Sequence, residues 1–332
     1  EAVVQAWRSR RPATVRISQT RCREYIRDAR LPEVIDDRLT VIGADDTRGR
    51  AIATLVGWAN HPEVLPPQNT ILTADYPHYL IGRVEATRGG VGLFVNGAIG
   101  GLMTPLKVPV KNGDGVLMAE GSFEKAAVVG EGVARRALEA LATARPVPAR
   151  LALATTQVFV PLTNRGFRIL SGLGVIPRTV YTDGRVDTST TTTRYWWKKL
   201  PTVAGRDVLT EVGLLDIGPA RAALIPGEIY PELVIGGIPM PPAHGADFPN
   251  APIEEPPGEH GVGGRPFFVI GLANDELGYI IPKTEWDQKK PFLYGQRKPP
   301  YGEINSAGSD LAPAIMSAMR GLAQRGLGTR RR

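Results

Sequence analysis

The stretch Ile52-Ala-Thr-Leu-Val-Gly-Trp58, followed by Asn60-His61-Pro62, decides how this chain is interpreted. It reads as an apolar strand that ends in a loop carrying a histidine. Three later segments have the same form, an apolar run that ends in a potential ligand or hydroxyl: residues 95–105, 225–228 and 270–279. Because ligand sites of open α/β sheets form at the carboxyl ends of strands, these four strand ends predict one shared pocket.

Length and composition indicate an ordinary globular protein of one large domain or two intimate ones. The 332 residues, 42% hydrophobic and 22% charged, are enough to bury roughly three quarters of the unfolded surface. We expect a single domain over residues 1–325, with an α/β fold in which helices pack on a mixed β-sheet core. The chain starts at Glu1 without a methionine, so we expect that a preceding segment belongs to the natural protein.

The charge and cysteine content exclude several classes of function. The net charge of +7 is scattered along the chain and forms no basic stripe with interleaved aromatics, which argues against nucleic acid as a partner. The positive charge instead favours attraction to anionic lipid or to another acidic surface. Cys22 is the single cysteine, so neither an intrachain disulfide nor a cysteine zinc site can form.

Hydrophobic periodicity predicts the order of helices and strands. Ser122 is the expected N-cap of the longest helix, in which Val129, Val133, Ala137 and Leu141 form one apolar stripe. The expected helices cover residues 1–9, 75–88, 122–144 and 309–322, and the expected strands 14–18, 39–42, 52–58, 91–95, 151–160, 207–217, 221–225 and 267–272.

Two long segments interrupt this pattern. Residues 163–206 show no clear period and contain Tyr195-Trp196-Trp197 beside Lys198-Lys199; these aromatics either pack on the body or form a rim for an apolar substrate or lipid surface. Residues 238–266 are rich in proline and glycine, which predicts an extended loop. A loop of this length in a compact domain is usually functional or mobile.

Candidate metal ligands come from distant strand ends. The four histidines, His61, His78, His244 and His260, have no helical spacing that would make an HExxH site. The strand-end geometry suggests His61, Glu228 and Tyr279 for zinc, which accepts His, Glu and less often Tyr. Each also has an ordinary interpretation: a structural histidine, an exposed acid in a turn, and a half-buried aromatic residue.

The glycine-rich stretch Asn96-Gly-Ala-Ile-Gly-Gly101 follows the expected strand 91–95. Backbone N–H groups of Gly100 and Gly101 could hold an oxyanion beside a metal, with the Thr104 hydroxyl at the rim. The alternative is that these glycines serve close backbone packing. The stretch lacks the patterns that bind nucleotide phosphates.

Five short motifs in this order resemble the catalytic domain of the neutral ceramidase family. They are Trp58-Ala-Asn-His-Pro62, Leu72-Thr-Ala-Asp-Tyr-Pro77, Phe94-Val-Asn-Gly-Ala-Ile-Gly100 through Thr104-Pro105, Ile225-Pro-Gly-Glu228, and Gly271-Leu-Ala-Asn274 through Gly278-Tyr279. The resemblance implies a zinc amidase that cleaves the N-acyl bond of a ceramide-like substrate, with His61, Glu228 and Tyr279 as zinc ligands. It places Thr104 near the family's active-site serine and implies a secreted or periplasmic protein.

Two departures from the family pattern shape the functional hypothesis. The stretch Gly100-Gly-Leu-Met-Thr104-Pro105 lacks the family's aspartate, and the family's first zinc histidine, in a His-Thr-His-Ser-Gly-Pro-like motif, is absent. We therefore expect a preceding segment or second chain to supply that histidine. The main hypothesis is a zinc-dependent hydrolase of N-acyl lipid-like substrates, with a possible membrane-surface contact; the alternative is a non-catalytic relative that kept the fold.

Overall fold

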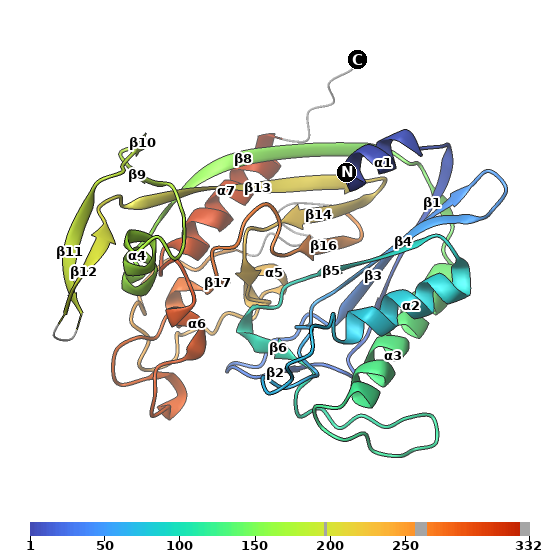
Figure 1. Cartoon of the computed structure of the whole chain (residues 1–332), viewed down its shortest axis with the longest axis horizontal. Helices are drawn as coiled ribbons and strands as arrows, with labels where there is room; N and C mark the ends of the chain where they lie inside the picture. Colours follow the sequence, from blue (N-terminus) through green and yellow to red (C-terminus); the bar gives the residue numbers. More distant parts are fainter. Residues whose placement is uncertain (196–197, 256–263, 326–332) are drawn as a thin grey trace.

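The first half of the protein is a five-stranded sheet covered on one face by two helices. The computed structural model describes residues 1–195, 198–255 and 264–325. The sheet has the order β5-β4-β3-β1-β7, and α2 and α3 lie side by side against it (Figure 1). Its elements are β1 (Ala13–Arg21), β3 (Arg38–Asp46), β4 (Ala51–Trp58), α2 (Tyr76–Arg88), β5 (Val91–Asn96), α3 (Phe123–Ala142) and β7 (Pro146–Val147).

The local sequence explains these elements. β3 and β4 form an antiparallel hairpin, and α2 crosses from β4 to the parallel strand β5. In α3, the Ser122 side chain accepts a hydrogen bond from the Lys125 backbone N–H, which caps the helix. The predicted apolar stripe of α3 is fully buried against the rest of this half, so the helix prediction is confirmed.

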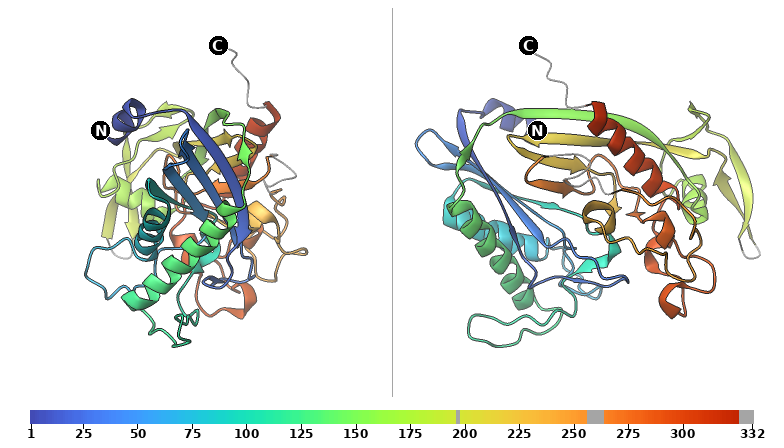
Figure 2. Two further views of the ribbon diagram at one scale, coloured as in Figure 1. Left: turned by 90° about the vertical axis from the view of Figure 1, so that its right-hand side faces the viewer. Right: turned by 180° about the vertical axis from the view of Figure 1, so that it is seen from behind.

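The second half is built on another sheet. Its order is β10-β9-β13-β14-β16, and β8 pairs with β13 along its whole length. α7 lies across β8 and β13 (Figure 2). Its elements are β8 (Leu151–Pro161), β9 (Val180–Thr182), β10 (Arg185–Val186), β13 (Asp207–Ile217), β14 (Ala220–Leu224), β16 (Phe267–Ile270) and α7 (Leu311–Arg325).

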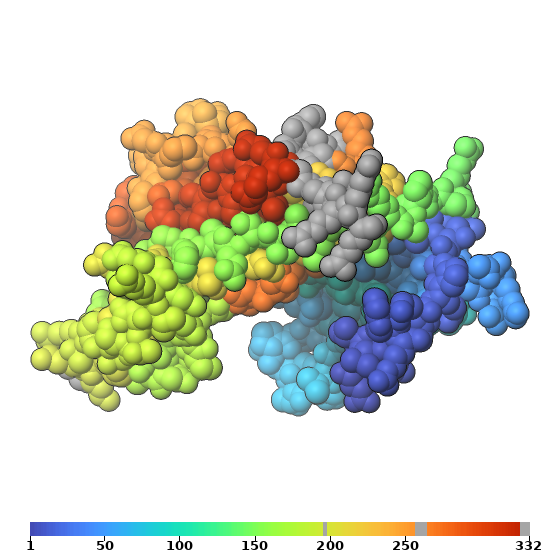
Figure 3. Space-filling view, turned by 90° about the horizontal axis from the view of Figure 1, so that it is seen from above, coloured from blue at the N-terminus to red at the C-terminus, as the bar shows by residue number. Residues whose placement is uncertain are grey.

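Residues 163–206 hold more regular structure than their sequence predicted. They form α4 (Arg165–Gly172), the short pair β9 and β10, and a hairpin of β11 (Thr190–Tyr195) and β12 (Lys198–Val203). Seen from above, this segment and the N-terminal half project on either side of an indentation (Figure 3). The threonine-rich run forms a strand because β-branched side chains suit pleated backbone. Trp196 and Trp197, proposed as a rim, lie outside the described residues.

The two sheets meet through a small apolar cluster formed by Ile42, Ala220, Ala222 and Phe268. The α/β class is confirmed, although the strands belong to two main sheets and several short ladders where we expected one mixed sheet.

The remaining elements are short. They are α1 (Ala2–Arg8), β2 (Arg27–Asp28), η1 (Gly100–Leu102), β6 (Met103–Thr104), β15 (Glu228–Ile229), α5 (Glu232–Ile235), β17 (Tyr279–Ile280), η2 (Lys283–Glu285), η3 (Leu293–Gly295) and α6 (Tyr301–Ile304).

The proline-rich segment behaves as expected where it is described. After α5, residues 238–255 contain neither helix nor strand.

In the described part of the chain, no helix has both the length and the apolar character needed to cross a bilayer. The expectation of a single domain over residues 1–325 stays a prediction.

Candidate metal centre

The three predicted zinc ligands lie together at the junction of the two halves. His61 follows β4 in the first sheet. Glu228 and Tyr279 are opposite each other in the parallel pair β15 and β17. Nε2 of His61 lies 2.7 Å from Oε2 of Glu228, and the Tyr279 hydroxyl is hydrogen-bonded to Glu228. The predicted convergence of distant strand ends is therefore present.

A backbone carbonyl orients the His61 ring. Nδ1 of His61 lies 2.6 Å from the Met103 carbonyl oxygen, which also accepts the His61 backbone N–H at 3.0 Å. A carbonyl oxygen only accepts, so Nδ1 carries the hydrogen and neutral His61 presents the lone pair of Nε2 to Glu228. Metal-bound histidines are usually held in this way, with the second ring nitrogen donating to a carbonyl or carboxylate.

The local charges couple these groups. Burial alone lowers the pKa of His61, but the hydrogen bond and negative charge of Glu228 outweigh it and raise the pKa above its ordinary value. Burial, followed by the charge of Glu228, raises the pKa of the Tyr279 hydroxyl well above its usual range. Nε2 of neutral His61 and Oε2 of ionised Glu228 are both hydrogen-bond acceptors. In the metal-free protein, a proton must therefore lie between them to form a hydrogen bond.

Glycines allow this close arrangement. Gly278 has φ of +81°, and a Cβ there would lie 1.8 Å from the Asn305 carbonyl oxygen, so this backbone approach requires glycine. Gly100 packs on the strand that carries Glu228: a Cβ would lie 2.6 Å from the Glu228 carbonyl oxygen and 2.4 Å from the Tyr230 ring. The packing interpretation of Gly100 thus has direct structural support, while its oxyanion role stays a prediction.

Gly101 and Thr104 lie apart from the pocket beside the ligands. Gly101 has φ of +69° and faces the Asp28 carboxylate. Thr104 is 2% exposed, and its hydroxyl accepts a hydrogen bond from the Leu106 backbone N–H. Neither residue lines the adjoining cavity. A catalytic role for Gly101 or Thr104 stays a prediction.

A cavity of about 440 Å³ opens beside the ligands, with Glu228 and Tyr279 in its wall. Its volume falls within the usual range for small-molecule sites. Most of the lining is apolar. The lining residues are Leu162, Phe167, Ser171, Ile176, Arg178, Val208, Glu228, Leu272, Glu276, Leu277, Gly278, Tyr279, Tyr301, Asn305 and Ala307.

Sequence reasoning offered the segment 163–206 as a rim through its aromatic residues, but it did not identify Phe167 and Ile176, which line this cavity. Phe167 lies on α4 and Ile176 lies four residues after its end, and both line the cavity. Arg178 also lines the cavity and forms a two-pronged ion pair with Asp275, at 2.7 and 2.8 Å. The amphipathic character of residues 165–172 was a usable signal for a helix that covers an apolar site.

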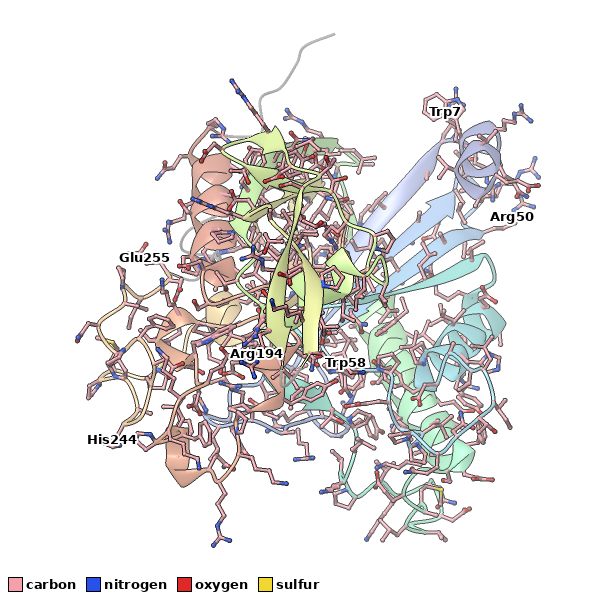
Figure 4. All side chains as sticks on the ribbon, turned by 60° about the vertical axis from the view of Figure 1, so that its left-hand side comes forward. Trp7, Arg50, Trp58, Arg194, His244 and Glu255 are labelled. Atoms are coloured by element: carbon pink, nitrogen blue, oxygen red, sulfur yellow. The ribbon has the colours of Figure 1, made fainter. Side chains whose placement is uncertain are left out.

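The other histidines do not complete the ligand set in the described structure. His78 is exposed on α2 and stacks edge-on with Tyr79. His244 lies on a peripheral loop, well apart from Trp58 at the end of β4 (Figure 4). His260 is outside the described residues. Within residues 1–195, 198–255 and 264–325, no three His, Cys, Asp or Glu side chains are grouped to hold a metal; the convergent set needs Tyr279 as its third donor.

Comparison with known proteins supports the same fold. No protein-family profile matches the sequence, and no curated protein is similar to it. The structure is similar to neutral ceramidase from Pseudomonas aeruginosa, with a TM-score of 0.63 and 15% identity, over 96% of this chain and 53% of that one. It is also similar to a ceramidase complexed with C2, with a TM-score of 0.60 and 15% identity, over 94% and 53% of the two chains.

The chain thus spans about half the length of the ceramidases it matches. The resemblance that five short motifs predicted is confirmed at the level of the fold. The fold of this chain therefore corresponds to about half of the fold of neutral ceramidase.

Proposed function

We propose that this chain supplies three ligands, His61, Glu228 and Tyr279, to the zinc centre of a hydrolase that cleaves N-acyl amides. The observation that carries the proposal is the convergence of these three side chains, with Glu228 and Tyr279 in the wall of an apolar cavity. The donor set suits zinc, which binds imidazole nitrogen and carboxylate oxygen at tetrahedral sites. The fold similarity to neutral ceramidase supports the same assignment.

Zinc, when bound, would supply a water of near-neutral pKa and polarise the amide carbonyl. The residues of this chain perform the remaining tasks. The Met103 carbonyl keeps the lone pair of His61 Nε2 available, and Glu228 contributes negative charge. The Tyr279 hydroxyl stays protonated in the metal-free protein because burial and Glu228 raise its pKa, so it donates a hydrogen bond there.

The cavity indicates the acyl part of the substrate. Leu162, Phe167, Ile176, Val208 and Leu277 line it, and such a surface favours a hydrocarbon chain by removing apolar area from water. The proposed substrate is therefore an N-acyl lipid-like amide whose chain extends from the ligands toward α4.

A preceding segment or second chain that supplies one more histidine is part of the proposal, because His61 is the one histidine near these donors among the described residues. Membrane-surface contact and a secreted or periplasmic location stay predictions.

Metal content tests the proposal. Elemental analysis of the protein, purified in zinc-replete buffer together with any natural partner segment, should give about one zinc per chain. His61→Ala should lose that zinc, whereas His78→Ala, a change at an exposed histidine on α2, should retain it. Absence of zinc from the unaltered protein would contradict the proposal.

The alternative, a non-catalytic binding relative, is favoured by one observation: Thr104 lies outside the cavity lining. Zinc-loaded protein that binds N-acyl amides but hydrolyses none of a series from acetyl to palmitoyl would support that alternative.

A further inference from the structure

A second cavity lies behind Tyr301, a residue that lines both cavities. It has a volume of about 250 Å³. The Tyr301 ring packs edge-on against Tyr279, with 6.0 Å between ring centroids. A molecule bound at the candidate zinc centre could therefore extend into both spaces, one on each side of Tyr301. Aromatic and proline side chains form much of the second wall, including Tyr294, Pro299 and Pro300.

A buried carboxylate with unused hydrogen-bonding capacity lines this second cavity. Asp287 is 0% exposed. Its Oδ2 accepts the Leu293 backbone N–H at 2.9 Å, and its own N–H donates to Glu303 Oε1 at 3.1 Å. Oδ1 of Asp287 is buried and accepts no hydrogen bond from the described residues. Buried polar atoms are nearly always paired, so this oxygen indicates a missing donor.

The guanidinium group of Arg30, next to Asp287, is already hydrogen-bonded to Glu303. Arg30 also lines the cavity, but its NH1 and NH2 groups each donate to Glu303 at 2.9 Å, and NH2 donates to the Glu285 carbonyl oxygen as well. The buried carboxylates of Asp287 and Glu303 thus face one guanidinium that is committed to Glu303. Lys298 also lines the cavity, but the buried Oδ1 of Asp287 itself can only accept, so at that atom a hydrogen-bond donor is favoured over an anion.

We propose that the second cavity binds the amine portion of the substrate and that Asp287 selects amines carrying a hydrogen-bond donor, either a hydroxyl or an ammonium group. This inference rests on the proposed amide hydrolase function. With the acyl chain in the first cavity, the part beyond the amide nitrogen passes Tyr301 and donates to Oδ1 of Asp287. Asp287 is then a specificity residue for the leaving amine.

Non-hydrolysable octanesulfonamides of matched amines separate binding from catalysis. Four probes would be titrated by calorimetry: the derivatives of ethanolamine, ethylenediamine, propylamine and glycine. The protein should bind the ethanolamine or ethylenediamine probe about tenfold or more tightly than the propylamine probe, the range expected for a hydrogen bond to a charged group. Asp287→Asn should reduce this ratio severalfold, which a purely structural role of Asp287 would not do.

A second variant keeps the test decisive if Asp287→Asn does not fold. Gln296→Trp places a large side chain in the lining of the second cavity and should weaken binding of the donor-bearing probes about tenfold or more, without weakening binding of octanoic acid. Arg297→Trp is the matched control, since Arg297 is exposed on the same loop and does not line the cavity.

Equal affinity for the ethanolamine and propylamine probes, tightest binding of the glycine probe, or unchanged binding by Gln296→Trp would overturn the inference. If the donor preference is found but no N-acyl amide is hydrolysed, the proposed function fails and the second cavity remains a binding site with the stated preference.

Discussion

His61 and Glu228 are 167 positions apart in the chain, yet His61 Nε2 lies 2.7 Å from Glu228 Oε2. One residue follows a strand of the first sheet and the other belongs to a short ladder in the second half. The bond therefore forms only when the two halves pack together. The protonation of His61 therefore reports on whether the two halves have assembled the site.

Glu228→Gln should lower the pKa of His61 in the metal-free protein. The charge of Glu228 and its hydrogen bond raise that pKa, and a neutral amide removes the charge while it keeps a similar shape. Titration of the imidazole resonances by NMR measures the shift, and the resonance of exposed His78 should not move. An unchanged His61 pKa would show that the pair is not formed in solution.

Glu232→Gln should stabilise the protein at neutral and alkaline pH. Burial, then the charge of Glu285, raises the pKa of Glu232 from its ordinary 4.5 to about 9. Between these values the folded state holds a proton that the unfolded chain has released, so this residue makes stability fall as pH rises from about 4.5 to about 9.

Urea unfolding at several pH values checks this, because the gain from Glu232→Gln should grow across that window. Glu131→Gln, a change at an exposed residue of α3, should alter stability by no more than about 0.5 kcal/mol. A gain from Glu232→Gln that is independent of pH would count against a raised pKa.

Arg30→Met should cost about 3–5 kcal/mol of unfolding free energy, since it leaves the charge of Glu303 buried without its partner. The ion pair is almost fully buried, with side-chain exposures of 9% and 0%. Arg21→Met breaks an ion pair with Asp37 in which the arginine side chain is 74% exposed, and it should cost less than about 1 kcal/mol. Chemical denaturation compares the two; equal losses would refute the distinction.

Gly100→Ala should destabilise the protein by about 1–3 kcal/mol and weaken metal binding together, because its Cβ would push the backbone that carries Glu228. The control is Gly82→Ala on the exposed face of α2, where nothing lies within 4 Å of the new Cβ and where helix propensity predicts a gain of about 1 kcal/mol. Thermal unfolding and zinc titration measure both effects. Normal zinc affinity in Gly100→Ala would argue that the close contact does not position Glu228.

Ile176→Trp should shorten the acyl chains that the protein accepts, because Ile176 lines the first cavity. We expect a loss of tenfold or more in kcat/KM for palmitoyl amides, on the order of one to two kcal/mol of lost apolar burial, with little change for acetyl amides. Val175→Trp, at the adjacent residue that is 65% exposed, should leave the chain-length profile unchanged. Equal losses for both chain lengths would point to general damage.

The parts of this fold that depend on local pattern could be predicted. The apolar stripe of α3 and its Ser122 cap lie within a few residues of one another, and the β3–β4 hairpin joins neighbouring segments. The structure in residues 163–206 could not be read in the same way. Its hairpin and α4 depend on contacts with each other and with the body, which a periodicity search does not detect.

The sequence by itself determined the order of the motifs, the identity of the candidate ligands and the type of most helices and strands, because side-chain periodicity and capping act over a few residues. Only the tertiary structure decided that Nε2 of His61 faces Glu228, that Thr104 lies outside the first cavity, and that Tyr301 lines two cavities. These relationships join residues far apart in the chain, so they arise from the packing of two sheets and their loops.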